Sequence, residues 1–198
     1  HLDSTPTHSL ARALYRYPQN EFPYARLIEE NRRRSREEPE FELRDTGLFE
    51  GNRFFDVEVV YAKQSPDDTL IRVRITNRGP DTAELHVLPT LWYRNTWSWG
   101  CTHEGCSPRP RLRALDRSQV EGVHESLGTY RFEVGPAPDG TQPELWFTEN
   151  ETNTEQLFGV PNATPYVKDA FHRRLVHGET TATNPSSVGT KVAAHYPL

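Results

Sequence analysis

The sequence predicts a mainly β protein, an antiparallel β-sandwich with two short helices near its N-terminus. The chain has 198 residues, enough to bury one substantial core, and the expected organisation is a single domain over residues 1–198. Sixteen prolines and twelve glycines indicate many turns and few long helices. Several segments alternate apolar and polar residues with a period of two, which is typical of strands with one buried face and one wet face.

The two helices are expected before residue 37. Apolar residues within 9–17 recur at helical spacing, and Pro18 would end that helix. A second helix is expected after Pro23, where apolar residues again fall on one side. Residues 29–36 are charged all round, so the end of this helix should lie on the surface.

From residue 41 onward the pattern changes to that of strands. Residues 53–61 and 69–77 alternate apolar and polar side chains, and the turn-forming residues 65–68 separate them. A third strand-like segment, 83–91, follows the turn at 77–81. Three strands joined by short turns predict an antiparallel meander, and its polar outer face predicts one sheet of a sandwich.

Four more strands are expected later in the chain, at residues 120–123, 129–134, 144–147 and 191–196. Residues 148–183 have neither period and are rich in asparagine, threonine, histidine and charged residues. An irregular segment of that length in a compact domain is either functional or tied down by other parts of the protein.

Composition excludes several classes of partner. The net charge is −5, which gives no electrostatic case for nucleic acid or an anionic membrane. No apolar run is long enough to span a bilayer, and the start lacks a signal-peptide pattern. The chain opens on His1 rather than methionine, as a fragment of a longer protein would. Two cysteines exclude a disulfide scaffold and fit a reducing compartment, so a cytoplasmic location is expected.

The most distinctive stretch is aromatic. Residues 93–100 contain Trp97 and Trp99, two of the four tryptophans, and Trp92 immediately precedes them. Large aromatic side chains with a polar edge suit a plug at the end of a core, and they equally suit a platform for stacking sugars. Most buried aromatic residues only pack, so the plug is the favoured interpretation and the sugar platform is the alternative.

No motif dictates a reaction by itself. Cys101, His103 and Cys106 place two thiols and an imidazole within six residues. Structural zinc needs four ligands, and no second Cys/His pair stands out, so no metal site is predicted. A plain surface loop is the favoured interpretation of this segment, with an adventitious disulfide as the alternative.

Residues 147–153 supply two carboxylates, Glu149 and Glu151, directly after an expected strand. Paired carboxylates are what glycoside cleavage requires, but the separation of these two in space is not readable from their spacing. The alternative is a loop whose side chains bond to its own backbone.

Residues 166–174 place a lysine, an aspartate and a histidine close together. The alternative to a functional cluster is a short surface helix, because structural ion pairs are commoner than acid–base sets. Such a helix would direct Val167, Ala170 and Phe171 inward.

Five segments are distinctive when they are taken together: LDSTPTHS (2–9), EENRRR (29–34), LPTLWYRNTWSWG (88–100), FTENETN (147–153) and NATPYVKDAFH (162–172). The chain resembles, through these segments, the N-terminal region of large microbial proteins related to glycoside hydrolase family 63 and the mannosylglycerate-hydrolase-like glucosidases. The likeness extends over essentially all 198 residues.

That resemblance implies a division of labour. In the family, an N-terminal β-sandwich of the supersandwich type precedes an (α/α)6 toroid that carries the catalytic carboxylates. This chain would then be the non-catalytic sandwich alone, with further sequence before His1 and after Leu198. Its implied partners are the catalytic (α/α)6 domain of the same polypeptide and carbohydrate, without nucleic acid, membrane, metal or other cofactor. A purely structural interdomain module and a free-standing carbohydrate-binding module are the alternatives.

Nine residues are the candidates for contact with sugar. Trp97 and Trp99 would stack on sugar faces, and the amide, carboxylate, lysine and histidine side chains would hydrogen-bond hydroxyl groups. The full set is Asn95, Trp97, Trp99, Glu149, Asn150, Asn153, Lys168, Asp169 and His172.

Overall fold

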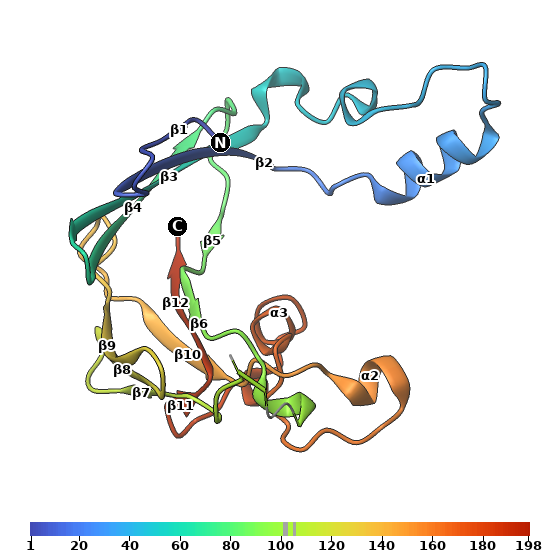
Figure 1. Cartoon of the computed structure of the whole chain (residues 1–198). Helices are drawn as coiled ribbons and strands as arrows, with labels where there is room; N and C mark the ends of the chain where they lie inside the picture. The colour runs from blue at the N-terminus through green and yellow to red at the C-terminus, as the bar shows by residue number, and fades with distance from the viewer. Residues whose placement is uncertain (101–102, 105) are drawn as a thin grey trace. The chain divides into compact units, whose positions relative to one another are not determined.

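The computed structural model describes residues 1–100, 103–104 and 106–198 (Figure 1). The described residues form three antiparallel sheets and few helices, so the mainly β fold class is confirmed. The chain divides into two compact units, His1–Ala83 and Glu84–Leu198. The single domain expected over residues 1–198 stays a prediction.

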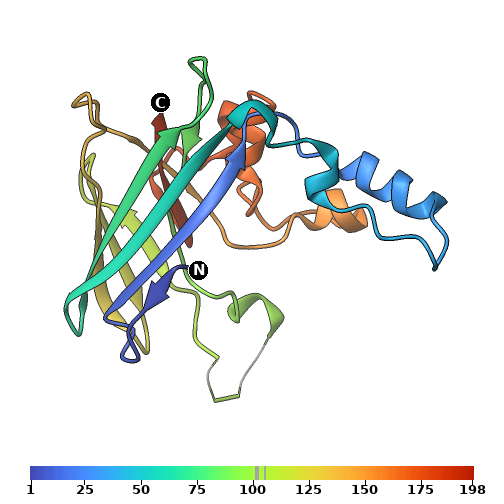
Figure 2. The same ribbon diagram turned by 90° about the horizontal axis from the view of Figure 1, so that it is seen from above.

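The first unit is built on a four-stranded sheet in the order β1-β2-β3-β4. The strands are β1 (Asp3–Ser4), β2 (Leu10–Pro18), β3 (Phe54–Ser65) and β4 (Asp68–Asn77). Long antiparallel ladders join β2 to β3 and β3 to β4, and Figure 2 shows these three strands side by side. The strands expected at residues 53–61 and 69–77 are therefore confirmed as β3 and β4.

The two faces of this sheet differ in chemistry. One face carries ion pairs between Arg12 and Glu58 and between Asp56 and two arginines. The strand register places tyrosines and branched aliphatic residues on the other face: Tyr15, Tyr17, Val57, Val59, Tyr61, Ile71, Val73 and Ile75. Tyr15 and Ile71 keep 60% and 51% of their surface exposed, so much of this apolar face is uncovered.

The helix expected at residues 9–17 is wrong, because this stretch is strand β2. The same residues also alternate along the chain, with Arg12 and Arg16 on one face and Tyr15 and Tyr17 on the other. An isolated nine-residue helix is marginal in water, whereas β2 pairs with β3 at nine successive positions. Pairing between strands therefore decides the structure here.

The second expected helix is present as α1 (Tyr24–Arg33). It lies on the segment between β2 and β3, which also holds η1 (Leu43–Thr46) and η2 (Glu50–Asn52). The Asn31 side chain fixes α1 to the returning chain, because its Nδ2 donates to the Phe41 carbonyl oxygen at 2.9 Å and its Oδ1 accepts from the Phe41 amide at 2.8 Å.

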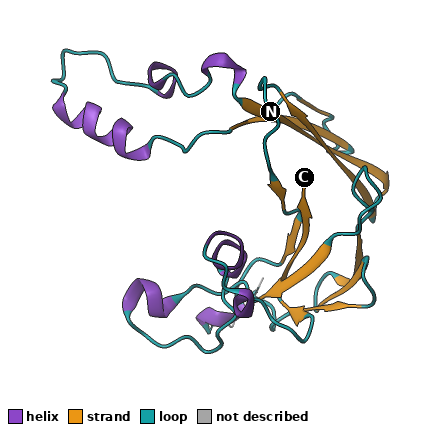
Figure 3. Cartoon of the chain, turned by 180° about the vertical axis from the view of Figure 1, so that it is seen from behind, coloured by secondary structure: helices purple, strands orange, loops and turns teal. Residues whose placement is uncertain are grey.

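The second unit contains two sheets and most of the described helices (Figure 3). One sheet has the order β10-β12-β5, with β6 also paired to β12; the other has the order β11-β7-β8-β9. The strands are β5 (His86–Val87), β6 (Thr90–Trp92), β7 (Arg111–Ala114), β8 (Gln119–His124), β9 (Gly128–Glu133), β10 (Glu144–Thr148), β11 (Val188–Gly189) and β12 (Lys191–Pro197). The helices are η3 (Trp97–Trp99), α2 (Thr154–Phe158), α3 (Ala170–Val176) and η4 (Thr180–Ala182).

The core of this unit lies between its two sheets. Leu112 and Val120 come from one sheet, Phe147 and Val192 from the other, and Tyr93 completes the buried cluster. On the opposite side of β10 and β12, α3 packs through Phe171 against Trp146 and Ala193. The sheet that contains β10 and β12 is thus covered on both faces. This packing positions the loops that follow β6 and β10.

Most later expectations about strands are confirmed. The strands expected at residues 120–123, 129–134, 144–147 and 191–196 correspond to β8, β9, β10 and β12. The segment 83–91 is instead two short strands, β5 and β6, separated at Leu88 and Pro89. Strand β7 was not predicted. No helix among the described residues is long and apolar enough to cross a membrane.

Candidate functional site

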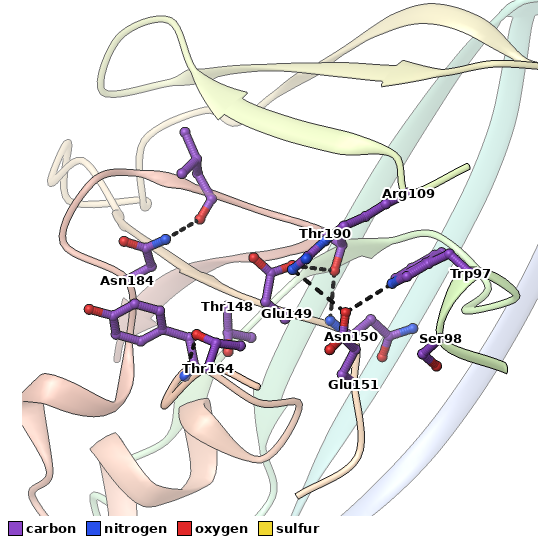
Figure 4. A network of polar contacts seen from close by, with 12 residues as sticks. Trp97, Ser98, Arg109, Thr148, Glu149, Asn150, Glu151, Thr164, Asn184 and Thr190 are labelled. Atoms are coloured by element: carbon purple, nitrogen blue, oxygen red, sulfur yellow. Dashed lines mark hydrogen bonds and ion pairs between the residues drawn. The ribbon is translucent and has the colours of Figure 1, made fainter. Parts of the chain in front are cut away.

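A network of polar contacts surrounds the loop that follows β10 (Figure 4). The buried Glu149 carboxylate accepts a hydrogen bond from Thr190 Oγ1 at 2.8 Å, and its Oε2 lies 2.9 Å from the Arg109 guanidinium. Arg109 also lies 3.6 Å from Glu151. Thr190 Oγ1 in turn accepts from the Asn150 amide at 2.7 Å. Arg109 thereby contacts both carboxylates of the loop, and Thr190 binds the Glu149 carboxylate.

The aromatic stretch is tied to the same loop. Trp97 Nε1 donates to Glu151 Oε1 at 2.9 Å, and the Trp97 side chain packs against the core between the sheets. Two asparagine side chains join the segments: Asn95 Nδ2 donates to the Asn150 carbonyl at 2.8 Å, and Asn150 Nδ2 donates to the Tyr93 carbonyl at 2.9 Å. These contacts match the core plug, because both the face and the edge of Trp97 have partners in the chain.

Electrostatics reinforce this structural role. Partial burial disfavours the charged Arg109 guanidinium, but the hydrogen bond and negative charge of Glu149, with the charge of Glu151, outweigh that cost and raise the pKa of Arg109. The cation therefore stays charged between its two carboxylates. Glu149 and Glu151 have their described partners within the chain: Arg109, Thr190 and Trp97. The network therefore holds the loop after β6 against the loop after β10.

We expect replacement of Trp97 by phenylalanine to lower the free energy of unfolding by about 1 kcal/mol, since the indole hydrogen bond to Glu151 is lost while most of the packing remains. Urea unfolding of both proteins measures the difference. Trp92→Phe is the matched control, because Trp92 is exposed and its replacement should cost less than about 0.5 kcal/mol. Equal costs for the two variants would contradict the role assigned to the Trp97 edge.

A second polar region lies around α2 and α3, where the surface is hollowed into a pocket of about 510 Å³. Amides, carboxylates, imidazoles and one guanidinium line it: Asn153, Glu155, Gln156, Asn162, Pro165, Asp169, His172, Arg173, His177 and Glu179. Asn153 caps α2 by accepting from the Gln156 amide at 3.1 Å. Its Nδ2 donates to Asp169 Oδ2 at 2.9 Å, which joins the two helices across the pocket.

The pocket wall combines carboxylate, imidazole and guanidinium groups. Asp169 Oδ1 is buried and has no hydrogen-bond partner among the described residues. The His172 and His177 rings meet edge to face with centroids 5.2 Å apart. Arg173 Nη2 donates to Glu179 Oε2 at 2.6 Å, so the one guanidinium of the lining is already paired. The lining therefore has more carboxylates than unpaired cations. This chemistry suits a neutral ligand rich in hydroxyl groups better than an anion.

Backbone contacts connect the two polar regions. The Lys168 amide donates to the Glu151 carbonyl oxygen at 2.9 Å, and the Lys168 carbonyl accepts from Lys191 Nζ at 2.8 Å. Burial lowers the pKa of Lys191, and the nearby charge of Lys168 lowers it further, while Asp169 acts in the opposite direction. Lys168 therefore contributes backbone groups here, and its own side chain is exposed.

The nine residues suggested by the sequence fall into separate places. Asn95, Trp97, Glu149 and Asn150 belong to the network, while Asn153, Asp169 and His172 line the pocket. The side chain of Trp99 lies outside the described part of the chain, as do Cys101, Thr102 and Gly105, so the suggested disulfide is outside it too. Within residues 1–100, 103–104 and 106–198, no group of three or more His, Cys, Asp or Glu could hold a metal ion.

Two members of the network were not predicted. Arg109 stands between prolines in an irregular segment, and Thr190 lies between strands β11 and β12. The sequence around each residue does not indicate its role, because its partners in the network are distant in the chain. The short helix considered for residues 166–174 is present in part, because α3 begins only at Ala170; Val167, Ala170 and Phe171 are buried as expected.

The chain is similar to an uncharacterized protein of Saccharomyces cerevisiae, YMR196W, with 36% identity over 223 aligned residues. The match covers 99% of this chain and 20% of the yeast protein, so the chain spans about a fifth of its relative's length. No family model matches the chain. No solved structure matches it significantly.

Proposed function

We propose that this chain is a non-catalytic β-sandwich module of the supersandwich type, from a protein related to glycoside hydrolase family 63. Its loops would form part of a carbohydrate pocket beside an (α/α)6 catalytic domain of the same polypeptide. The observation that carries this proposal is the polar hollow around α2 and α3, with Asn153, Asp169 and His172 in its wall. The reaction itself would take place on the other domain.

The chemistry of the hollow supports a sugar ligand. A volume of about 510 Å³ falls within the range of small-molecule sites. Sugar hydroxyls both donate and accept, and the wall offers carboxylate acceptors beside amides and imidazoles that can do either. In this proposal the network of Trp97, Arg109 and Glu149 supports the rim and does not stack on sugar.

A purely structural interdomain module is the second candidate, and a different observation favours it. Leu157, Phe158 and Val160 on and after α2 are exposed, as is Val176 at the end of α3. The first three lie within four residues of one another, and exposed apolar side chains so close together favour contact with another domain. In this alternative the apolar groups dock on the catalytic domain, and the hollow is a by-product of the loop structure.

Sugar binding by the full-length protein separates the two candidates. We expect Asp169→Asn to weaken the binding of a glucoside about 10- to 100-fold, since a charged acceptor for ligand hydroxyls is lost. Isothermal titration calorimetry measures the affinity. Glu125→Gln, an equivalent change at an exposed turn outside the pocket lining, should leave the affinity unchanged.

The stability of the same variants, measured by unfolding, is the second test. An Asp169→Asn protein that loses stability but binds glucoside as tightly as the wild type would favour the structural module and contradict the proposed pocket. Trp97→Phe should lower stability and leave the affinity unchanged, because Trp97 does not line the hollow.

A further inference from the structure

Two histidines join the first strand of the second unit to the last one. His86 Nδ1, on β5, lies 2.9 Å from His195 Nε2, on β12, and the two rings stack with centroids 5.1 Å apart. The His195 ring also stacks on Trp146 of β10 at 4.1 Å. The hydrogen-bonded imidazole pair thus lies over a buried aromatic face, where each change of charge has a large effect.

The contacts of the pair determine how it shares hydrogens. His86 Nε2 lies 3.3 Å from Glu84 Oε1, which favours a hydrogen on that nitrogen. In the neutral pair His86 Nδ1 is then the acceptor, and His195 Nε2 donates to it. The hydrogen bond tolerates one added proton, because the ring that stays neutral can adopt the tautomer that accepts. A second proton leaves N–H groups facing each other, and the bond is lost.

Burial and the charge of the first proton oppose that second proton, while two neighbouring carboxylates favour it. Three charged groups face the pair: Glu84 beside His86, Glu144 opposite His195 in the β10–β12 ladder, and Arg174 of α3. The Arg174 guanidinium lies 4.6 Å from the Trp146 ring centroid and is paired with Glu144 at 2.7 Å. Burial lowers the pKa of His195 most, and the charge of His86 lowers it further; Glu144 acts in the opposite direction, and Arg174 has the smallest, lowering effect.

Strand β5 depends strongly on this pair. It has two residues, His86 and Val87, and its flanking bonds are the reciprocal ones between Leu85 and Leu198, at 3.0 and 2.9 Å. So short a strand has few ladder bonds to hold it, and a side-chain bond at its first residue adds a large fraction of the total. We propose that His86 and His195 form a proton-operated latch, which holds β5 on β12 at neutral pH and releases it when both rings are protonated.

The sign of the pH dependence follows from the lowered pKa of His195. The unfolded chain takes up this proton near pH 6.5, whereas the folded chain resists it to lower pH. The contribution of this group to the free energy of unfolding is therefore complete above about pH 6.5 and is lost as the pH falls below that value. For one proton, the unfolding equilibrium constant rises by at most about tenfold per pH unit. The latch does not rest on the proposed carbohydrate pocket.

A double-mutant cycle with the full chain tests the latch. Unfolding equilibrium constants of the wild type, His86→Gln, His195→Gln and the double variant are measured at pH 7.5 and 5.0. We expect a favourable coupling between the two positions at pH 7.5 that is lost at pH 5.0. His8→Asn, a change at an exposed histidine of the first unit, should leave the pH profile of the wild type unchanged. A coupling that is equal at both pH values would overturn the latch.

Hydrogen exchange of the wild-type chain supplies a reading that needs no variant to fold. Protection factors, corrected for the intrinsic effect of pH, should fall for the Leu85 and Leu198 amides between pH 7.5 and 5.5. Protection of the Trp146 amide, in the longer β10–β12 ladder, should stay constant. Equal changes at all three amides would mean that acid loosens the unit as a whole, and the proposal would be wrong.

Discussion

Replacing Gly189 by alanine is expected to lower the free energy of unfolding by about 3 kcal/mol, near the upper end for overpacking. A Cβ atom at this position would lie 2.2 Å from the Thr148 carbonyl oxygen and 3.0 Å from its carbon. Both are backbone atoms of β10, so no side-chain rotation relieves the clash. Urea unfolding measures the loss. The displaced carbonyl also accepts the Thr190 amide at 3.1 Å, so the polar network next to it would be disturbed.

Gly135→Ala is the matched control for this prediction. A Cβ atom there meets no atom within 4 Å, and the backbone does not require a positive φ. We expect a change within about 0.5 kcal/mol. If the two glycine variants were equally stable, the close approach of β11 to β10 would be refuted.

Replacing Glu149 by alanine is expected to cost about 2–3 kcal/mol. The carboxylate is buried, and its removal leaves the Thr190 hydroxyl without its acceptor and Arg109 without its nearest anion. We place the cost below that of a fully buried ion pair, because half of the Arg109 side chain is exposed to solvent. Chemical denaturation at pH 7 measures the difference from the wild type.

An exposed ion pair of the same unit provides the comparison for Glu149. Arg113 and Glu121 lie 2.8 Å apart on the open face of β7 and β8, where water screens them. Glu121→Ala should therefore cost less than about 1 kcal/mol. A loss at Glu121 as large as that at Glu149 would show that burial does not set the strength of the Glu149 network.

The parts of the fold that were predictable are those whose pattern allows one interpretation. Residues 54–77 alternate over two long segments around an obvious turn, and they form β3 and β4. Residues 10–18 satisfy both a helical and a strand period, so only the presence of β3 beside them decides the outcome. Strand β7 is four residues long and directly follows a proline-rich stretch, which masks its alternation of arginine with leucine and alanine.

The candidate site was predictable as residue types and not as an arrangement. Asparagine, carboxylate and histidine side chains after β10 suggested polar chemistry, and they do lie in the network or the pocket. Their partners could not be identified, because Thr190 meets Glu149 across 41 positions of the chain. Asn153 and Asp169 are brought together only because the N-terminal ends of α2 and α3 meet.

The order of strands along β12 has a consequence for biosynthesis. β5, β6 and β10 all pair with β12, although β12 is made last of the four. During translation these earlier strands must therefore wait, unpaired with it, until residues 191–197 have left the ribosome. Pairing across about a hundred residues also makes this sheet slow to close, and slow closure leaves apolar strands exposed to aggregation. A chaperone that binds the nascent chain would therefore need to stay bound longest at the strands of this sheet.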